Sequence, residues 1–162
     1  MSHLARAAKP KTKPPMITIV GTPGTGKTTL GAMFPNALLV MSEDGASVFD
    51  SWDEEAKPSV LPRLPKASKD EVGNLRSTRE TLLSIMDELI GTDHGFTTLV
   101  VDSITSLDML FGHEIALRDN VNTVADASGG FHKGYAEVAS WHAEFVYKCE
   151  QLRAVKRMGI VF

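Results

Sequence analysis

A glycine-rich turn followed by a lysine and two threonines is the part of this sequence best suited to chemistry. The stretch TIVGTPGTGKTTLGAMF, residues 18–34, contains Gly21, four further residues and then Gly26-Lys27-Thr28. This is the spacing of a phosphate-binding loop, in which glycines let backbone amides point at an anion and a helix begins directly behind them. Lys27 would reach the β- and γ-phosphates, and the Thr28 hydroxyl would coordinate Mg²⁺. The spacing therefore predicts a site for a nucleoside triphosphate and Mg²⁺.

The whole loop and the start of the following helix are expected to contact the phosphates. The flanks support this interpretation, because the β-branched run MITIV precedes the loop as a buried strand would and TTLGAMF can form a helix. The alternative is a chance match in a glycine-rich turn. The residues expected to bind the nucleotide are Gly21, Thr22, Pro23, Gly24, Thr25, Gly26, Lys27, Thr28 and Thr29.

Two other apolar runs end in carboxylates that would complete this site. TTLVVDSIT ends its run on Asp102, where a carboxylate can hold Mg²⁺ through the water shell of the ion. The alternative is that Asp102 caps the following helix, with Ser103 assisting or capping in its place. LLVMSEDG ends in Glu43 and Asp44, and we expect Glu43 to orient the water that attacks the γ-phosphate. Otherwise this pair only solvates a turn closed by Gly45.

The elements that must position these residues alternate between strands and helices. Apolar runs typical of strands buried on both faces cover 16–20, 37–41, 97–101 and 159–162. A helix is predicted over 77–91, where Ser77 and Glu80 form a capping box. This alternation predicts an α/β fold with a parallel sheet flanked by helices, and it places the phosphate loop at a carboxyl end of a strand.

A longer helix is predicted over 134–157, and an irregular segment over 53–70. The irregular segment carries three prolines, with a short edge strand near Val60. The long helix has apolar residues at steps of three or four, so we expect Trp141 and Cys149 to be core residues and not reactive ones. These apolar positions are Tyr135, Val138, Trp141, Phe145, Cys149 and Leu152.

The overall composition fits one soluble domain. The chain has 162 residues, of which 43% are hydrophobic, and this is enough for one core but not comfortably for two. It contains neither a run of about 20 apolar residues nor the apolar core of a secretion signal. The single cysteine excludes an internal disulfide framework. We therefore expect a cytoplasmic protein that does not associate with membranes.

Charge is distributed unevenly along the chain. Net charge is −3, yet the first 42 residues hold five basic and no acidic side chains, which leaves 12 basic and 20 acidic ones in the remainder. Residues 1–15 are predicted to be a flexible basic arm that is a solvated tail, a nucleic-acid contact or a cleaved organelle signal. Residues 16–162 are expected to form the core. Because the chain stops at Phe162 within an apolar run, we expect this core to be incomplete at its C-terminus.

The loop, LLVMSEDG and LVVDSIT together resemble the RecA-like P-loop ATPase core, in which a glutamate follows the second strand and serine follows the metal aspartate. The resemblance covers about residues 16–162 and is greatest to phage-encoded RecA-like ATPases of single-strand annealing and recombination. Those proteins also tend to have a Gly/Lys/Tyr element ahead of a long helix, here GGFHKGY. The resemblance implies hydrolysis of ATP with Mg²⁺, with the loop as Walker A, Asp102 as Walker B, and Lys27, Glu43 and Asp102 as the catalytic group.

By the same resemblance, residues 119–135, DNVNTVADASGGFHKGY, occupy the place of a mobile DNA-facing loop. Lys133 would contact a phosphate, and Phe131 and Tyr135 would stack on unpaired bases. His132 is a further possible DNA contact. The same residues suit an ordinary loop with an aromatic helix staple. The polar sensor residue and the second DNA loop of this family would lie beyond Phe162.

The partners implied are ATP and ADP, single-stranded DNA, and either further copies of the chain or a single-strand-binding protein. If the chain is phage-encoded, its location is the cytoplasm of a bacterial host. One alternative is a non-catalytic, nucleotide-gated binding module or helicase loader. A small-molecule kinase is a weaker alternative, because residues 44–76 offer only Arg63 and Arg76 for an arginine-rich lid.

Overall fold

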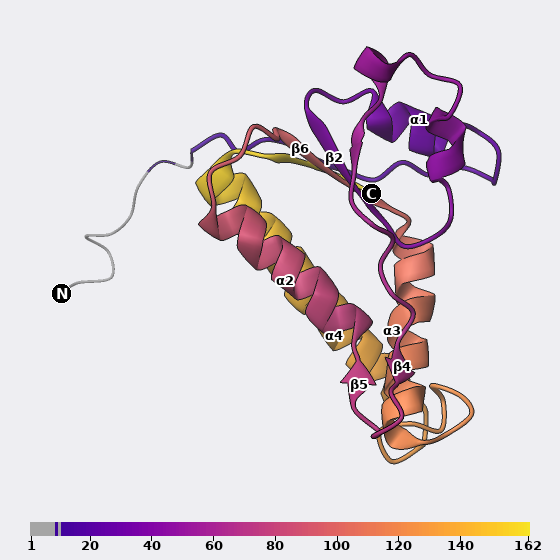
Figure 1. The fold of residues 1–162 in the computed structure, drawn as a ribbon. Helices are drawn as coiled ribbons and strands as arrows, with labels where there is room; N and C mark the ends of the chain where they lie inside the picture. Colours follow the sequence, from indigo (N-terminus) through magenta and orange to yellow (C-terminus); the bar gives the residue numbers. More distant parts are fainter. Residues whose placement is uncertain (1–8, 10) are drawn as a thin grey trace.

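A five-stranded parallel sheet forms the centre of the molecule. The computed structural model describes residues 9 and 11–162, so most of the predicted basic arm lies outside the described residues. The strand order is β1-β7-β6-β2-β3, and every neighbouring pair is parallel (Figure 1). The strands are β1 (Met16–Ile17), β2 (Ala37–Met41), β3 (Ser59–Val60), β6 (Thr98–Asp102) and β7 (Gly159–Val161).

Helices cover both faces of this sheet. The helices α2 (Thr78–Gly91), α3 (Ile104–Asp119) and α4 (Lys133–Gln151) pack on one face, and α1 (Lys27–Ala32) packs on the other (Figure 1). Alternate strand residues supply the two cores, as the pleat requires. In β2, Val40 belongs to the core under α2, α3 and α4, whereas Leu39 belongs to the core under α1. The predicted α/β fold with a parallel sheet is confirmed, and β2 and β6 are buried along their whole length. The prediction of a strand buried on both faces over 16–20 was wrong, because β1 lies at the edge of the sheet, where it is half-buried and Val20 is exposed.

Helix α2 begins where the capping box placed it, and a buried carboxylate of α3 fixes its start. The Ser77 side chain accepts a hydrogen bond from the Glu80 amide at 2.9 Å and donates its own proton to Glu114. The other Glu114 oxygen accepts from the Arg79 amide at 3.0 Å. Glu114 therefore acts as a second cap of α2 supplied by tertiary structure, at the helix end where negative charge is stabilising.

Helix α4 confirms most of the predicted core positions. Val138, Phe145, Cys149 and Leu152 are buried, and Trp141 is half-buried with the Arg79 guanidinium 5.2 Å from its ring. Burial raises the pKa of the Cys149 thiol to about 12, so the thiol stays protonated and unreactive. Tyr135 has the same helical spacing but is exposed, because the first turn of α4 stands at the far end of the molecule. The helix ends in a π-helical turn, Leu152–Lys156.

Other short elements connect the sheet to the helices. The expected edge strand near Val60 is present as β3, whereas strand β1 is shorter than the predicted 16–20. A hairpin of β4 (Ser68–Lys69) and β5 (Leu75–Arg76) was not predicted, because its four residues show no apolar alternation. Two 3-10 helices, Ala46–Phe49 and Glu54–Ala56, lie between β2 and β3. None of the described helices combines the length and hydropathy needed to cross a bilayer.

Candidate nucleotide site

The predicted phosphate loop connects β1 to α1 and uses its glycines where other residues would be strained. Gly24 and Gly26 have φ angles of 80° and 82°, in the left-handed region that favours glycine. A Cβ atom on Gly21 would lie 2.7 Å from Thr25 Oγ1, which donates a hydrogen bond to the Thr22 carbonyl at 2.8 Å. These glycines therefore allow a tight turn with an open backbone surface.

The start of α1 presents hydrogen-bond donors to the mouth of this loop. Within the described part of the chain, the amides of Gly24, Gly26, Lys27 and Thr28 have no hydrogen-bond acceptor. The Lys27 ammonium donates to the Gly21 carbonyl at 2.9 Å and to the carbonyl of the next residue at 3.1 Å. It therefore lies across the mouth of the loop. Converging amides and an ammonium group form a surface that suits phosphate oxygens.

Thr28 and Asp102 meet, although they are 74 residues apart in sequence. The Thr28 hydroxyl donates a hydrogen bond to the buried Asp102 carboxylate. The two elements come together because α1 packs closely on β6, where a Cβ on Gly31 would lie 2.8 Å from Val100 Cγ1. The helix cap is Ser103, whose side chain accepts from the amide three residues further on at 3.2 Å. The Asp102 carboxylate is thus on the side of the phosphate loop and does not cap α3.

The end of β2 lies beside the end of β6 and brings Glu43 to the same edge of the sheet. Met41 pairs with Asp102, so the next residues of each strand adjoin. The Ser42 hydroxyl donates to the Ser103 carbonyl at 2.7 Å and accepts from its amide at 2.8 Å. The turn continues past Thr28, since a Cβ on Gly45 would lie 4.0 Å from Thr28 Oγ1. Asp44 is exposed there.

The Glu43 carboxylate is oriented by a serine that the sequence analysis missed. Ser106 Oγ donates to Glu43 Oε2 at 2.7 Å, from the first turn of α3. Ser42, which joins the two strand ends, was also missed. The sequence did contain a signal for both serines. Ser42 directly follows one predicted strand, and Ser106 lies in the first turn of the helix after another. When two such strands are parallel neighbours, both positions lie at the same edge of the sheet. The turn thus carries one exposed carboxylate held by Ser106 and a second, Asp44, beside it.

A hollow of about 220 Å³ opens beside the phosphate loop. Gly21, Lys27 and Asp102 line it together with the carboxyl ends of β1, β6 and β7, whereas Glu43 does not. The crevice outside the carboxyl ends of parallel strands is where α/β proteins bind ligands. The loop, the carboxylate and the hollow thus converge at the expected edge of the sheet.

Residues 13–162 match the family described as AAA domain. The chain belongs to this family. No curated protein and no solved structure matches the chain significantly. An AAA domain is a nucleotide-binding ATPase module, and the parallel sheet with its phosphate loop has the α/β fold of P-loop NTPases.

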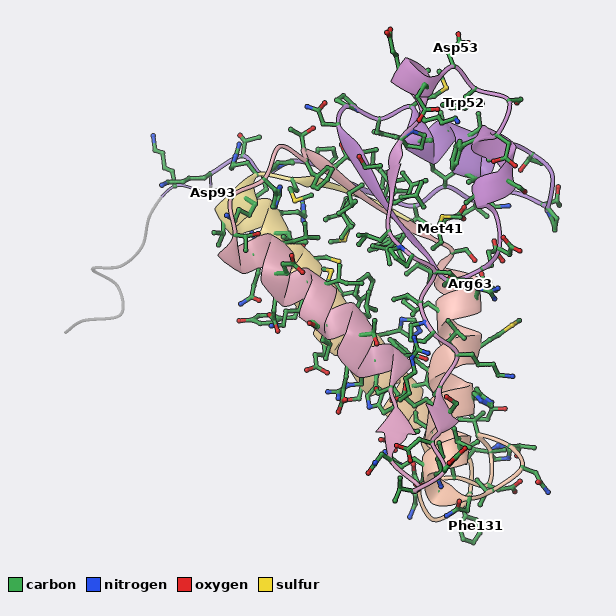
Figure 2. All side chains as sticks on the ribbon, viewed as in Figure 1. Met41, Trp52, Asp53, Arg63, Asp93 and Phe131 are labelled. Carbon is green, nitrogen blue, oxygen red and sulfur yellow. The ribbon has the colours of Figure 1, made fainter. Side chains whose placement is uncertain are left out.

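The predicted DNA-facing loop of this AAA domain lies far from the phosphate loop. It follows α3, whose 16 residues separate it from Asp102 by about 24 Å at 1.5 Å per residue. Phe131 is exposed at the far end of the molecule, and the His132 ring stacks on Tyr135 with centroids 6.0 Å apart (Figure 2). Lys133 is exposed beside them. The structure thus brings the four predicted contact residues together, but not near the candidate nucleotide site.

An ion-pair network holds the base of this distal loop. Arg118 pairs with both oxygens of Glu137 and, through Nε at 2.8 Å, with Asp119. Asp119 also accepts from the Ser128 amide at 2.6 Å, and the Ser128 hydroxyl donates to Glu137 at 2.6 Å. The Arg118 guanidinium lowers the pKa of both carboxyl groups, which remain charged at neutral pH.

Proposed function

We propose that this AAA domain binds ATP with Mg²⁺ and hydrolyses it, and that hydrolysis is coupled to single-stranded DNA in phage recombination or annealing. The observation that carries the catalytic part is the hydrogen bond between the Thr28 hydroxyl and the Asp102 carboxylate. It joins the helix behind the phosphate loop to the end of a neighbouring strand, which is the arrangement that a Mg-nucleotide site requires.

Residues Gly21 to Thr29 bind the phosphates in this proposal. Phosphate oxygens replace the Gly21 and Thr22 carbonyls as acceptors for Lys27 and also accept from the unpaired amides of the loop. Thr28 and Asp102 offer the hard oxygen donors that Mg²⁺ prefers, with Asp102 acting through a water ligand. The ion supplies charge neutralisation on the phosphates when it is bound.

Glu43 orients the attacking water in this proposal. Ser106 occupies one oxygen of its carboxylate, and the other oxygen remains available as an acceptor for water. The turn that carries Glu43 passes beside Thr28, which is the residue expected to coordinate Mg²⁺. Lys27 stabilises the charge that develops on the transferred phosphoryl group.

The coupling to DNA is supported by the distal loop and by the resemblance to phage RecA-like ATPases. Phe131, His132 and Tyr135 offer ring faces on which unpaired bases can stack, and Lys133 offers a cation for a phosphate. Action on a DNA strand would also involve further copies of the chain or a single-strand-binding protein.

The decisive experiment compares Glu43→Gln with Asp44→Asn, its exposed neighbour. Glu43→Gln should still bind Mg-ATP, measured by calorimetry, but lose hydrolysis by about a hundredfold or more, because a positioned base contributes about 10²–10⁴-fold. Asp44→Asn should hydrolyse ATP at the wild-type rate. Normal turnover by Glu43→Gln would contradict the assignment of Glu43.

A second measurement separates an ATPase from a nucleotide-gated binding module or helicase loader. Steady-state hydrolysis is measured with and without a single-stranded oligonucleotide. Stimulation by the oligonucleotide is the expected result, because α3 links the distal loop to Ser106, which holds Glu43. Mg-ATP binding without turnover in either condition would favour the binding module.

A further inference from the structure

The exposed side of α3 carries two adjoining hollows that connect the candidate nucleotide site to the distal loop. The first, of about 280 Å³, begins at Glu43 and Ser106 and extends to His113. The second, of about 360 Å³, extends to Tyr135. The two share Met109 and His113, so they form one surface, which we call the α3 groove. From Ser106 to Ala116 it spans about 15 Å, or about four nucleotides of one strand.

Cations border the upper half of the α3 groove. Residues 61–69 run beside α3 and carry Arg63, Lys66 and Lys69 at steps of three, without any acidic residue. Figure 2 shows Arg63 near the start of α3. The side chains of Arg63 and Lys66 are exposed, and neither forms an ion pair with any residue that the structure describes. Two unpaired cations beside one hollow favour an anionic ligand.

The two acidic residues that line the α3 groove, Glu43 and Asp108, each have a side-chain partner. The Glu43 carboxylate accepts from Ser106 at 2.7 Å, and Asp108 lies 3.2 Å from His142 Nε2. His113 is bound to the Ala67 carbonyl at 3.1 Å, which fixes the bordering segment to α3. Arg63 and Lys66 are therefore the cationic side chains of the groove that remain available to an anionic ligand.

The lower half of the α3 groove offers apolar and aromatic surface. Met109 is 69% exposed and Tyr135 is 54% exposed, although both are large hydrophobic side chains. Beyond Tyr135 stand His132, stacked on its ring, and Phe131, which is 93% exposed. The cations at one end of the groove and the exposed rings at the other offer partners for both the phosphates and the bases of an unpaired strand.

We propose that the α3 groove binds single-stranded DNA, with phosphates on Arg63 and Lys66 and bases against Met109 and Tyr135. This inference rests on the proposed function and extends it from the distal loop to a surface that ends at Glu43. A strand in this groove contacts the same helix that holds Glu43 through Ser106. An acidic peptide would use the cations but would gain nothing from the exposed rings.

The test measures binding of a fluorescein-labelled oligothymidylate to the full chain by fluorescence anisotropy at several salt concentrations. The double variant Arg63→Gln/Lys66→Gln should weaken binding on the order of tenfold. It should also reduce the slope of log K against log salt by about 1.4, because each phosphate contact on a single strand contributes about 0.7. Thermal melting checks that the variant is folded.

A matched control removes two charges elsewhere. Lys57→Gln/Lys148→Gln changes the net charge equally, but these lysines pair with Glu54 and Asp87 away from the groove. Binding by this control should stay within about twofold of wild type with an unchanged salt slope. Equal weakening by both double variants would overturn the proposal, because only net charge would then matter.

Tyr135 tests whether bases are recognised as well as phosphates. Tyr135→Ala should weaken binding of the oligothymidylate about tenfold, and Tyr135→Phe should restore it, because stacking needs the ring and not the hydroxyl. An oligonucleotide with abasic sites should bind both variants equally. If Tyr135→Ala weakens the binding of abasic and ordinary strands to the same extent, Tyr135 does not recognise bases and the proposal is wrong. The groove would then suit any polyanion, such as an acidic peptide.

The outcomes also separate this inference from the proposed function. If the groove variants bind the oligonucleotide as tightly as the wild-type protein does, the α3 groove is not the DNA site. The proposed coupling of hydrolysis to DNA would still stand. Failure of the wild-type protein to bind, with Mg-ATP hydrolysis intact, would overturn both the groove and the DNA coupling. It would leave the ATPase assignment standing.

Discussion

Two glycine-rich loops each lead into a helix that begins with lysine, yet only one of them has the chemistry of a phosphate site. The first precedes α1 and Lys27, and the second precedes α4 and Lys133. In both loops, several residues just before the helix have positive φ angles. At the first loop these residues are glycines, whereas the second also holds Ser128, Phe131 and His132 in that conformation.

The difference lies in where the amide donors of the two loops point. In the distal loop, the amides of Gly130, His132, Lys133 and Tyr135 donate to carbonyls of the same segment. In the phosphate loop, the Thr25 amide donates to the Thr22 carbonyl at 3.4 Å, but among the described residues the amides of Gly24, Gly26, Lys27 and Thr28 have no acceptor. A loop whose donors are used internally is structurally satisfied and has none to offer an anion.

The carboxylates near the two loops differ in the same way. Asp119 and Glu137 are bound by Arg118 and serve to hold the distal loop in place. Asp102 accepts from the Thr28 hydroxyl at the end of a parallel strand, beside an open hollow. A glycine-rich loop before a helix that begins with lysine is therefore not enough for phosphate binding, and here only the loop before α1 also has an opposing carboxylate at a strand end.

The largest difference between the two loops should be the loss of ATP turnover in Lys27→Ala compared with Lys133→Ala. It removes the charge expected to stabilise the phosphoryl group, so ATP turnover should fall by about two to three orders of magnitude. Lys133→Ala should instead change only the DNA concentration that gives half-maximal stimulation. Steady-state hydrolysis with titrated oligonucleotide measures both effects.

The exposed Lys57 provides the control for the loss of a positive charge, because it pairs only with Glu54. Lys57→Ala should leave turnover within about twofold of wild type. Normal turnover by Lys27→Ala would remove the distinction between the loops and with it the site assignment.

Alanine substitutions at two glycines that face Val124 should give the next largest difference, in the free energy of unfolding. A Cβ on Gly134 would lie 1.9 Å from the Val124 carbonyl oxygen, so Gly134→Ala must displace the distal loop. Overpacking of this kind costs about 1–3 kcal/mol. A Cβ on Gly112, in the middle of α3, would meet Val124 Cβ at 3.6 Å, an ordinary contact.

Gly112→Ala is therefore the matched control, and it should stabilise the protein by up to about 1 kcal/mol through helix propensity. Chemical denaturation measures both free energies of unfolding. Equal destabilisation by the two variants would show that Val124 does not anchor the loop as described. Neither variant should change ATP hydrolysis in the absence of DNA, because both lie far from the phosphate loop.

Acid should weaken the distal loop by a smaller amount. Arg118 lowers the pKa of Asp119 and Glu137 below their ordinary values of 3.8 and 4.5. Their contribution to stability is therefore complete above these ordinary values and is lost as the pH falls through the lowered folded pKa values. Because the pairs are partly exposed, the loss should be below about 1 kcal/mol.

The Ser128 amide resonance reports this titration directly, since the amide donates to Asp119. Its midpoint in an NMR titration should lie below pH 3.8, and Arg118→Gln should move it upward. A midpoint at the ordinary value in the wild-type protein would contradict the ion-pair network. The phosphate loop has no equivalent carboxylate pair bound to an arginine, so its amide shifts should not follow this titration.

Most of the fold followed from local patterns. Apolar runs located the strands, and the Ser77 capping box located the start of α2, because both depend on neighbouring residues alone. The β4–β5 hairpin was missed because Asp70 holds its turn by accepting from the Val72 and Asn74 amides, without an apolar pattern. Tyr135 shares the spacing of the buried positions of α4 yet is exposed, because helical spacing alone does not reveal where the supporting core ends.

The sequence by itself determined the phosphate loop, since its glycine spacing, lysine and threonine are a continuous segment whose chemistry is local. It also determined which strand ends carry carboxylates. Only the tertiary structure decided that Asp102 meets Thr28, that Ser106 holds Glu43, and that the distal loop lies at the other end of α3. These contacts join residues dozens of positions apart. Strand order and helix packing fix them, and no local pattern specifies either one.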